Sequence, residues 1–139
     1  MDNSIEIKIP AVSKNESLAR NIIAGFCVEL NPTIDEIDDV KTSVSEAVTN
    51  CIVHAYEEKG DIVIRANISG NTLHIEVEDF GMGINDIERA MQPFYTGKPE
   101  AERSGMGFTI MKSFMDELIV INKENGGVLL RMSKRFTEQ

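Results

Sequence analysis

The chain has 139 residues and a formal net charge of −9 at pH 7, with 42% hydrophobic and 27% charged residues. Its length fits one domain, residues 1–139, with one hydrophobic core. The negative charge argues against a nucleic-acid partner, because phosphate backbones attract basic surfaces. It is consistent with a protein partner that has a basic surface, or it only aids solubility.

Nothing in the sequence predicts a membrane segment or an exported protein. No apolar run reaches 18 residues, and the N-terminus lacks a signal-peptide pattern. Cys27 and Cys51 both fall on apolar helix positions, which predicts buried thiols in a reducing compartment, not a disulfide or a metal pair. We therefore expect a cytoplasmic protein with no membrane partner.

The N-terminal segment predicts a strand and then a helix. Isoleucines alternate with polar residues as far as Pro10, which predicts a strand. Ser13 and Glu16 suggest a capping box, which predicts a helix from about Lys14 to Leu30. The expected apolar line of this helix is Leu18, Ile22, Phe26 and Leu30. Arg20 falls on the other side, where it either faces solvent or meets a partner protein.

A second, longer helix follows a capping box of Thr33 and Glu36. Its apolar residues recur at three- and four-residue steps as far as Ala55: Ile34, Ile37, Val40, Val44, Val48, Cys51 and Ile52. Glu46, Asn50 and His54 are four residues apart, so we expect them to stack along one face, with Cβ atoms about 5–6 Å apart.

This polar stripe has two interpretations. A carboxylate, an amide oxygen and an imidazole in a row could hold water, Mg²⁺ and phosphate, because Mg²⁺ prefers oxygen ligands. The alternative is a solvated stripe opposite the core, with His54 a surface or packing residue.

The next segment predicts a hairpin that ends in a glycine hinge. Two alternating runs, Ile62 to Ile68 and Thr72 to Glu78, are joined by Gly70-Asn71. Asp79 ends the second run and is followed by Gly81 and Gly83, which permit positive φ and close approach of a ligand. A carboxylate here could accept a hydrogen bond from the amino group of adenine. An ordinary turn from strand to helix is the alternative.

A loop and a second glycine cluster complete the candidate site. The polar stretch from Gln92 to Arg103 predicts a loop, and long loops of this kind often act as lids. Its Lys98 and Arg103 either reach phosphate oxygens or are solvated surface cations. The cluster Ser104-Gly105-Met106-Gly107-Phe108 precedes an apolar helix, where free amides can bind an anion. No Walker loop and no dinucleotide fingerprint occurs in the sequence.

Two more strands, Leu118–Asn122 and Val128–Lys134, are predicted around Asn125-Gly126-Gly127. The whole pattern predicts an α+β fold, a two-layer α/β sandwich with an antiparallel or mixed sheet and helices on one face. The other face is then less fully covered, or covered by a second copy. The N-terminal strand could extend the sheet across a homodimer.

Four short motifs occur in an order that resembles the Bergerat-type ATP-binding fold of gyrase, Hsp90, histidine kinases and MutL. They are E-A-V-T-N-C-I-V-H, D-F-G-M-G, T-G-K-P and R-S-G-M-G-F. Within that group the chain is similar to the anti-sigma-factor serine kinases. Three segments resemble the anti-sigma F family of sporulation specifically: Ser43 to Asn50, Lys98 to Phe108 and Asn15 to Arg20. The resemblance extends over nearly the whole chain.

The resemblance implies a function in two parts. The protein would bind and inhibit a sporulation sigma factor. It would also be a serine kinase that uses Mg²⁺ and ATP to phosphorylate a small anti-anti-sigma protein, leaving ADP. Alternatives are a nucleotide-gated binding module with little catalysis, a general-stress anti-sigma kinase relative, and the catalytic half of a split histidine kinase.

The resemblance also implies roles for single residues. Glu46 matches the general base, Asn50 the magnesium ligand and Asp79 the carboxylate that reads adenine. If Arg20 meets a partner, we expect that partner to be a sigma factor, contacted through its acidic residues. The remaining nucleotide-binding positions are His54, Gly81, Gly83, Lys98, Arg103, Ser104, Gly105, Met106, Gly107, Phe108 and Thr109. Val128 stands where relatives often have a threonine that helps hold the adenine-binding Asp, so no hydroxyl is expected there; Gly97 likewise replaces a lid threonine.

Overall fold

The computed structural model describes residues 2–56, 60–81, 107–124 and 126–137, with only the backbone of residues 54–56. Within those ranges no helix combines the length and the apolar character needed to span a bilayer.

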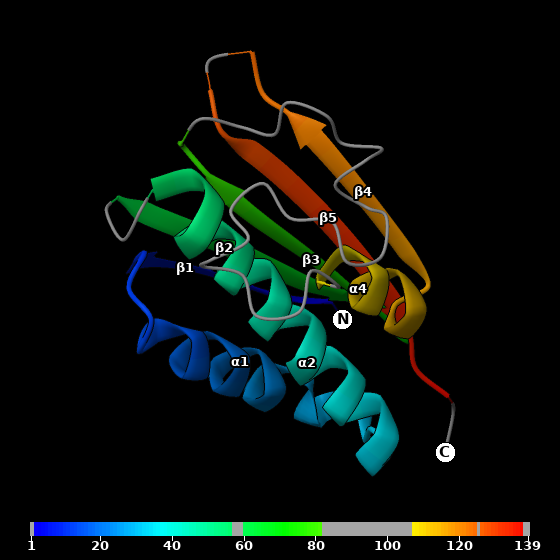
Figure 1. Cartoon of the computed structure of the whole chain (residues 1–139). Coiled ribbons are helices and arrows are strands. Elements are labelled where there is room, and N and C mark those ends of the chain that lie inside the picture. The colour runs from blue at the N-terminus through cyan, green and yellow to red at the C-terminus, as the bar shows by residue number, and fades with distance from the viewer. Residues whose placement is uncertain (1, 57–59, 82–106, 125, 138–139) are drawn as a thin grey trace.

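The described strands form one sheet in the order β1-β2-β3-β5-β4, in which each neighbouring pair is antiparallel. The strands are β1 (Asn3–Pro10), β2 (Asp61–Ser69), β3 (Thr72–Asp79), β4 (Glu117–Asn122) and β5 (Val128–Arg135). The helices α1 (Asn15–Phe26), α2 (Ile34–Asn50) and α4 (Gly107–Phe114) lie against one face of the sheet (Figure 1). The predicted two-layer α+β fold is confirmed, and the described sheet is antiparallel.

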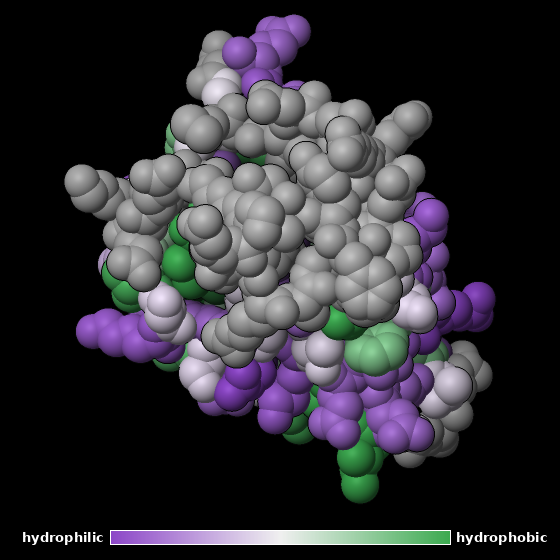
Figure 2. All heavy atoms as spheres, viewed as in Figure 1, coloured by the Kyte–Doolittle hydropathy of each residue, from purple (hydrophilic) through white to green (hydrophobic). Residues whose placement is uncertain are grey.

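The core lies between the sheet and the helices. Every second residue of β2 and β3 is buried, since side chains alternate between the two faces of a strand. The buried apolar residues of α2 are Val40, Val44, Ala47 and Val48, and Ser43 is buried beside them. Figure 2 shows that the outer surface over α1 and α2 is predominantly hydrophilic. The apolar faces of the helices and of the strands therefore pack against each other in one core, as a two-layer fold requires.

The first helix differs from its prediction. It begins at Asn15, and Lys14 at its N-cap makes no side-chain capping bond. The N-cap is therefore Lys14 and not the predicted Ser13; the Glu16 N–H donates to the carbonyl oxygen of Ser13 at 3.2 Å, and Glu16 Oε2 accepts from the hydroxyl of Thr49 on α2 at 3.3 Å. The α-helix ends at Phe26 and continues as a 3₁₀ turn, η1 (Cys27–Leu30).

The apolar line predicted for this helix is correct only in its second half. The fully buried positions are Asn15, Ala19, Ile23 and Cys27, and Leu18 is 45% exposed, whereas Phe26 and Leu30 are partly buried and pack against the core. The sequence offers two apolar stripes at four-residue spacing, one residue apart, and either one fits a helix period. The stripe that contains the small Ala19 is the more deeply buried of the two.

The second helix begins as predicted and ends differently. Thr33 and Glu36 form the expected capping box, in which the Thr33 hydroxyl accepts from the Glu36 N–H at 3.1 Å. The α-helix stops at Asn50 and is followed by a π-helical segment, η2 (Cys51–Tyr56). A π-helix bonds each residue to the fifth one along, so the backbone departs from the α-helix predicted as far as Ala55. The predicted stacking of His54 on Asn50 lies outside the described side chains. Such π segments are frequent at functional sites.

Candidate functional site

The glycine that begins α4 lies against the polar residues at the end of α2. A β-carbon on Gly107 would lie 3.1 Å from Oε2 of Glu46 and 3.4 Å from both amide atoms of Asn50. These distances are at or below ordinary van der Waals contact, so a side chain here would press on both groups. Glycine therefore lets the N-terminal end of α4, with its positive dipole, approach the carboxylate and the amide.

The amide of Asn50 has hydrogen-bonding capacity that the described residues leave unused. Its Nδ2 is buried and has no hydrogen-bond partner among them. A buried donor without an acceptor costs about 1–3 kcal/mol, so such groups usually meet a ligand or water. Nδ2 could donate to a phosphate oxygen, and Oδ1 is an oxygen ligand of the kind Mg²⁺ prefers. The chemistry of the Asn50 side chain therefore fits a magnesium-nucleotide.

A metal ion here would depend on few protein ligands. Among the described residues, no group of three or more His, Cys, Asp or Glu side chains could hold a metal ion. Mg²⁺ commonly keeps several waters and binds through one or two protein oxygens plus substrate phosphates. The chemistry at Asn50 suits that type of shell and not a metal cage built by the protein alone.

Asp79 ends β3 and is 4% exposed. Its Oδ1 accepts from the N–H of Gly81 at 3.1 Å and from the N–H of Val128 at 3.2 Å. The first bond is an Asx turn, which shapes the hinge after the strand. Burial raises the pKa of the Asp79 carboxyl, while these two N–H donors and the Cys51 thiol oppose the rise. Asp79 is thus a buried acid held from several sides.

The buried thiol of Cys51 is affected by Asp79, a relationship that sequence reasoning missed. Burial, and then the charge of Asp79, raise the pKa of the Cys51 thiol well above its usual value, so the group stays protonated. A helical apolar pattern predicts a buried thiol at this position, but it cannot indicate which strand the residue lies near.

The turn between β4 and β5 lies against the hinge. Gly127 has φ +87°, and a β-carbon on it would be 2.1 Å from the backbone oxygen of Asp79. Gly126, with φ +99°, lies near the oxygen of Gly81. These two glycines allow the backbone of Val128 to reach Asp79. Val128 has no hydroxyl to offer Asp79, as expected from the sequence, and its main-chain N–H donates to the Asp79 carboxylate instead.

Three chain segments distant in sequence thus meet at one place. Asn50 lies against the start of α4, and the charge of Asp79, at the end of β3, raises the pKa of the next residue, Cys51. The predicted phosphate position, Asn50, is thus at the end of α2, and the predicted base position, Asp79, is at the end of β3.

Other predicted site residues are only partly visible. Gly83, Lys98, Arg103, Ser104, Gly105 and Met106 lie outside the described residues, as does the side chain of His54. Phe108 packs in the hydrophobic core, so a ligand would meet its backbone and not its ring. Thr109 follows it in the first turn of α4.

Arg20 lies apart from this site, in a groove of about 420 Å³ between α1 and α2. Its guanidinium donates to the hydroxyls of Ser17 at 2.8 Å and Ser45 at 3.4 Å, and pairs with Glu16 at 3.6 Å. The side chain is 34% exposed. It is therefore held across two helices and still reachable from solvent.

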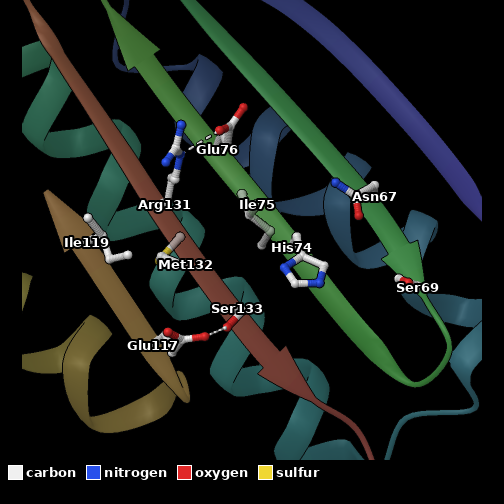
Figure 3. A pocket seen from close by; sticks show the side chains of 10 residues that line it. All are labelled: Asn67, Ser69, His74, Ile75, Glu76, Glu117, Ile119, Arg131, Met132 and Ser133. Carbon is white, nitrogen blue, oxygen red and sulfur yellow. Dashed lines mark hydrogen bonds and ion pairs between the residues drawn. The ribbon is translucent and has the colours of Figure 1, made fainter. Parts of the chain in front are cut away.

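A second hollow, of about 500 Å³, lies on the face of the sheet away from the helices (Figure 3). His74 from β3 and Arg131 from β5 project into it, and Arg131 pairs with Glu76 at 2.8 Å. Because strand side chains alternate, this hollow is on the opposite side of β3 from the buried Asp79. None of the predicted nucleotide-binding residues that the structure describes lines it.

The comparisons with known proteins agree with this geometry. The model of the histidine kinase-like ATPase domain matches residues 9–134. An anti-sigma F factor of Thermoanaerobacter sp. (strain X514) is 56% identical over 133 residues, covering 95% of this chain and 93% of that protein. An anti-sigma F factor of Anoxybacillus flavithermus is 47% identical over 140 residues, covering 99% and 96%.

Solved structures show the same fold at low identity. The RsbU and RsbW domains of Rv1364c from Mycobacterium tuberculosis match with a TM-score of 0.72 and 18% identity, over 99% of this chain and 33% of that chain. The catalytic domain of the histidine kinase ThkA matches with a TM-score of 0.61 and 18% identity, over 96% and 97%. The extent of these matches, together with the site described above, shows that the chain belongs to the anti-sigma F factor family of histidine kinase-like ATPases.

Proposed function

We propose that this protein is an anti-sigma factor that is also an ATP-dependent serine kinase. It binds and inhibits a sporulation sigma factor, and it transfers the γ-phosphate of ATP to a serine of a small antagonist protein. The observation that supports this most is the contact of Gly107 with Glu46 and Asn50, because it joins a helix N-terminus, a carboxylate and an unsatisfied amide.

Each described residue has a separate task in this proposal. Asp79 accepts from the amino group of adenine, and the glycine hinge at Gly81 lies beneath the base. Asn50 holds magnesium through Oδ1, and the metal neutralises charge on the phosphates when bound. The amides that begin α4 at Gly107 donate to phosphate oxygens. Positioning and charge neutralisation are most of what phosphoryl transfer requires.

Glu46 is the proposed general base. Its carboxylate is one helical turn from Asn50, within the same α-helix. It takes the proton of the substrate serine as the serine oxygen bonds to the γ-phosphorus. The bond from that phosphorus to the β,γ-bridging oxygen breaks, and ADP leaves with the electron pair. A module that only senses nucleotide needs no base at this position.

Residues outside the described ranges complete the proposal. In this proposal Gly83 contributes to adenine binding, and Ser104, Gly105 and Met106 contribute to phosphate binding, as the family resemblance implies. Lys98 and Arg103 supply positive charge to the phosphates.

Labelling with γ-³²P-ATP tests the kinase proposal. The full chain, magnesium, labelled ATP and a purified candidate antagonist are incubated, and label on serine is expected, stable to acid and labile to alkali. Glu46→Gln should lower the rate by about 10²–10⁴-fold with ATP still bound. Glu6→Gln, at an exposed position on β1, is the matched control.

Two results would contradict the kinase proposal. No label, combined with ATP-dependent binding of the partner, would indicate a nucleotide-gated binding module. Acid-labile label would indicate the catalytic half of a split histidine kinase.

The sigma contact is proposed at Arg20, in the groove between α1 and α2. Arg20→Glu should weaken binding to a sporulation sigma factor, because acidic residues on the sigma surface would then be repelled. ATP affinity should be unchanged. Equal loss of both would indicate misfolding and would contradict a local contact.

A homodimer in the cytoplasm is also part of the proposal. β1 is the first strand in the sheet order, so it pairs on one side with β2 only. Such an edge can extend a sheet into a second copy. Light scattering at micromolar concentration should give a dimer mass, and a monomer mass would contradict this assembly.

A further inference from the structure

Lys123 directly follows β4, where the chain turns back toward β5, and it contacts the hinge at the end of β3. Its Nζ pairs with Oε2 of Glu78 at 2.8 Å and lies 3.8 Å from the centroid of the Phe80 ring. Both members of the ion pair are largely shielded from water, with Lys123 19% and Glu78 18% exposed. One cation therefore contacts the two chain neighbours of Asp79.

These contacts lie on the opposite side of β3 from the Asp79 carboxylate. Side chains alternate between the faces of a strand, so Glu78 points away from the helical layer and the buried Asp79 points toward it. On the Asp79 side, the N–H of Val128 donates to the carboxylate at 3.2 Å. Lys123 and Val128, at the two ends of one turn, thus hold the hinge from both faces of the sheet.

The turn between them contains two glycines with positive φ, Gly126 and Gly127. Its main chain is closed by a bond from the N–H of Lys123 to the oxygen of Gly127 at 3.0 Å, and by one from the N–H of Gly126 to the oxygen of Lys123 at 3.2 Å. Glycine loses more conformational freedom on ordering than any other residue. A side-chain contact that anchors this turn therefore offsets a large entropic cost.

Glu78 is itself fixed by a second cation, from β2. Its Oε1 accepts from Arg65 at 2.5 Å, while Oε2 accepts from Lys123. The hydrogen bonds from Lys123 and from Arg65 lower the pKa of the Glu78 carboxyl, so the group is ionised at neutral pH. A carboxylate paired through both oxygens has a defined geometry, unlike an isolated surface ion pair.

We propose that Lys123 is a positioning residue for nucleotide binding. By pairing with Glu78 and lying over the Phe80 ring, it holds the β4–β5 turn on the hinge and keeps Asp79 in place for the amino group of adenine. This inference rests on the proposed function, specifically on nucleotide binding at Asp79.

The expected effect follows from the order of the hinge before the nucleotide arrives. Without Lys123, the turn and the hinge are correctly placed for only part of the time, and a nucleotide that binds must order them. The apparent affinity then falls by the fraction of molecules in the competent state.

The test measures ATP binding to the full chain by titration calorimetry in magnesium buffer. Lys123→Met removes the charge and keeps most of the length of the side chain. It should weaken ATP binding about three- to tenfold, the effect of one ion pair together with a cation–π contact. Lys123→Arg keeps a cation at this place and should retain most of the affinity.

Arg131→Met is the matched control. It breaks the ion pair of Arg131 with Glu76, which has the same length of 2.8 Å and lies on the same face of the sheet, away from the hinge (Figure 3). It should leave ATP affinity unchanged.

Glu78→Met distinguishes a positioning role from a simple effect of charge. If Lys123 acted only as a positive charge near the phosphates, removal of the negative charge of Glu78 would leave ATP binding unchanged or make it tighter. If the ion pair positions the hinge, Glu78→Met should weaken ATP binding as Lys123→Met does. The double variant should then bind ATP no more weakly than either single variant, because both changes break one interaction.

Two results would overturn the role of Lys123. One is an ATP affinity of Lys123→Met equal to that of Arg131→Met, as expected if the ion pair only contributes to stability. The other is a Glu78→Met variant that binds ATP at least as tightly as wild type. If Lys123→Met does not fold, Glu78→Met is decisive, because it breaks the same pair from the other side.

Asp79→Asn separates this inference from the proposed function. If the wild-type protein binds no ATP, or Asp79→Asn binds ATP as wild type does, the nucleotide site itself is wrong. If Asp79→Asn loses binding and the Lys123 and Glu78 variants do not, only the role of Lys123 fails.

Discussion

Gly107 and Glu46 lie so close that a single added methyl group at Gly107 would be 3.1 Å from the Oε2 atom of Glu46. This contact joins the start of α4 to the last turns of α2. It makes the spacing between the two helices depend on the absence of a side chain at one position.

Gly107→Ala should therefore damage the site more than the fold. The new methyl group displaces Glu46 and Asn50 by a few tenths of an ångström, and misplacement of catalytic groups is costly in rate. We expect phosphorylation to fall about ten- to a hundredfold, with a small change in melting temperature. Gly25→Ala on α1, where a β-carbon meets nothing within 4 Å, should instead stabilise the protein by about 0.5–1 kcal/mol. Equal effects of the two changes on activity would contradict the contact.

Gly127→Ala should destabilise the whole protein. Its φ of +87° is unfavourable for alanine, and the methyl group would lie 2.1 Å from the backbone oxygen of Asp79. We expect a loss of more than about 2 kcal/mol in the free energy of unfolding, measured by urea denaturation. Gly70 has φ +61° with open space around it, so Gly70→Ala should cost about 1–2 kcal/mol from backbone strain alone. A smaller loss at Gly127 than at Gly70 would contradict the close packing of the turn on the hinge.

Asp79 should make the nucleotide-free protein less stable at neutral pH. Burial raises its pKa in the folded state above the unfolded value of about 3.9, so the folded state favours the protonated acid. The contribution of Asp79 to stability is then full below the unfolded pKa and is lost as pH rises through the folded pKa. Asp79→Asn should remove this pH dependence and should not lower stability at pH 7, although it abolishes ATP binding.

Urea denaturation of wild type and Asp79→Asn across pH 3–8, without nucleotide, measures this difference. Wild type should lose stability relative to the variant as pH rises. A gain in relative stability over that range would mean that hydrogen bonds lower the pKa of Asp79 and that its carboxylate stabilises the fold.

Lys134 should matter for the attachment of α4. Its ammonium donates to the carbonyl oxygen of Phe114, at the end of α4, at 2.8 Å and pairs with Asp39 of α2 at 3.4 Å. The side chain is 12% exposed. Lys134→Met should cost about 1–3 kcal/mol of unfolding free energy, because a charged hydrogen bond to a helix end is lost. Lys8→Met, which breaks an exposed pair with Asp61 on β1 and β2, should change stability by less than about 0.5 kcal/mol. A similar cost for both would contradict the role of Lys134 as an anchor.

The strands and the second helix could be predicted because their patterns are unambiguous. Alternation in β2 and β3 continues for seven or more residues, and Gly70-Asn71 marks the hairpin between them. The capping box of Thr33 and Glu36 likewise has a local cause that needs no tertiary information.

The errors came from features that depend on tertiary packing. Two stripes of α1 fit the helix period, and only contact with the core selects Ala19 and Ile23 over Leu18 and Ile22. The change from α-helix to π-helix after Asn50 has no sequence pattern of its own, so an α-helix was predicted as far as Ala55. The effect of the Asp79 charge on the pKa of Cys51 links residues 28 positions apart, which a local pattern cannot indicate.

Calorimetric titration of magnesium-ATP into the full chain tests the central claim most directly, namely that Asn50, Asp79 and the start of α4 surround one nucleotide. We predict saturable heat with one site per chain, which disappears in Asp79→Asn. No heat with wild type, or the same heat with Asp79→Asn, would contradict it.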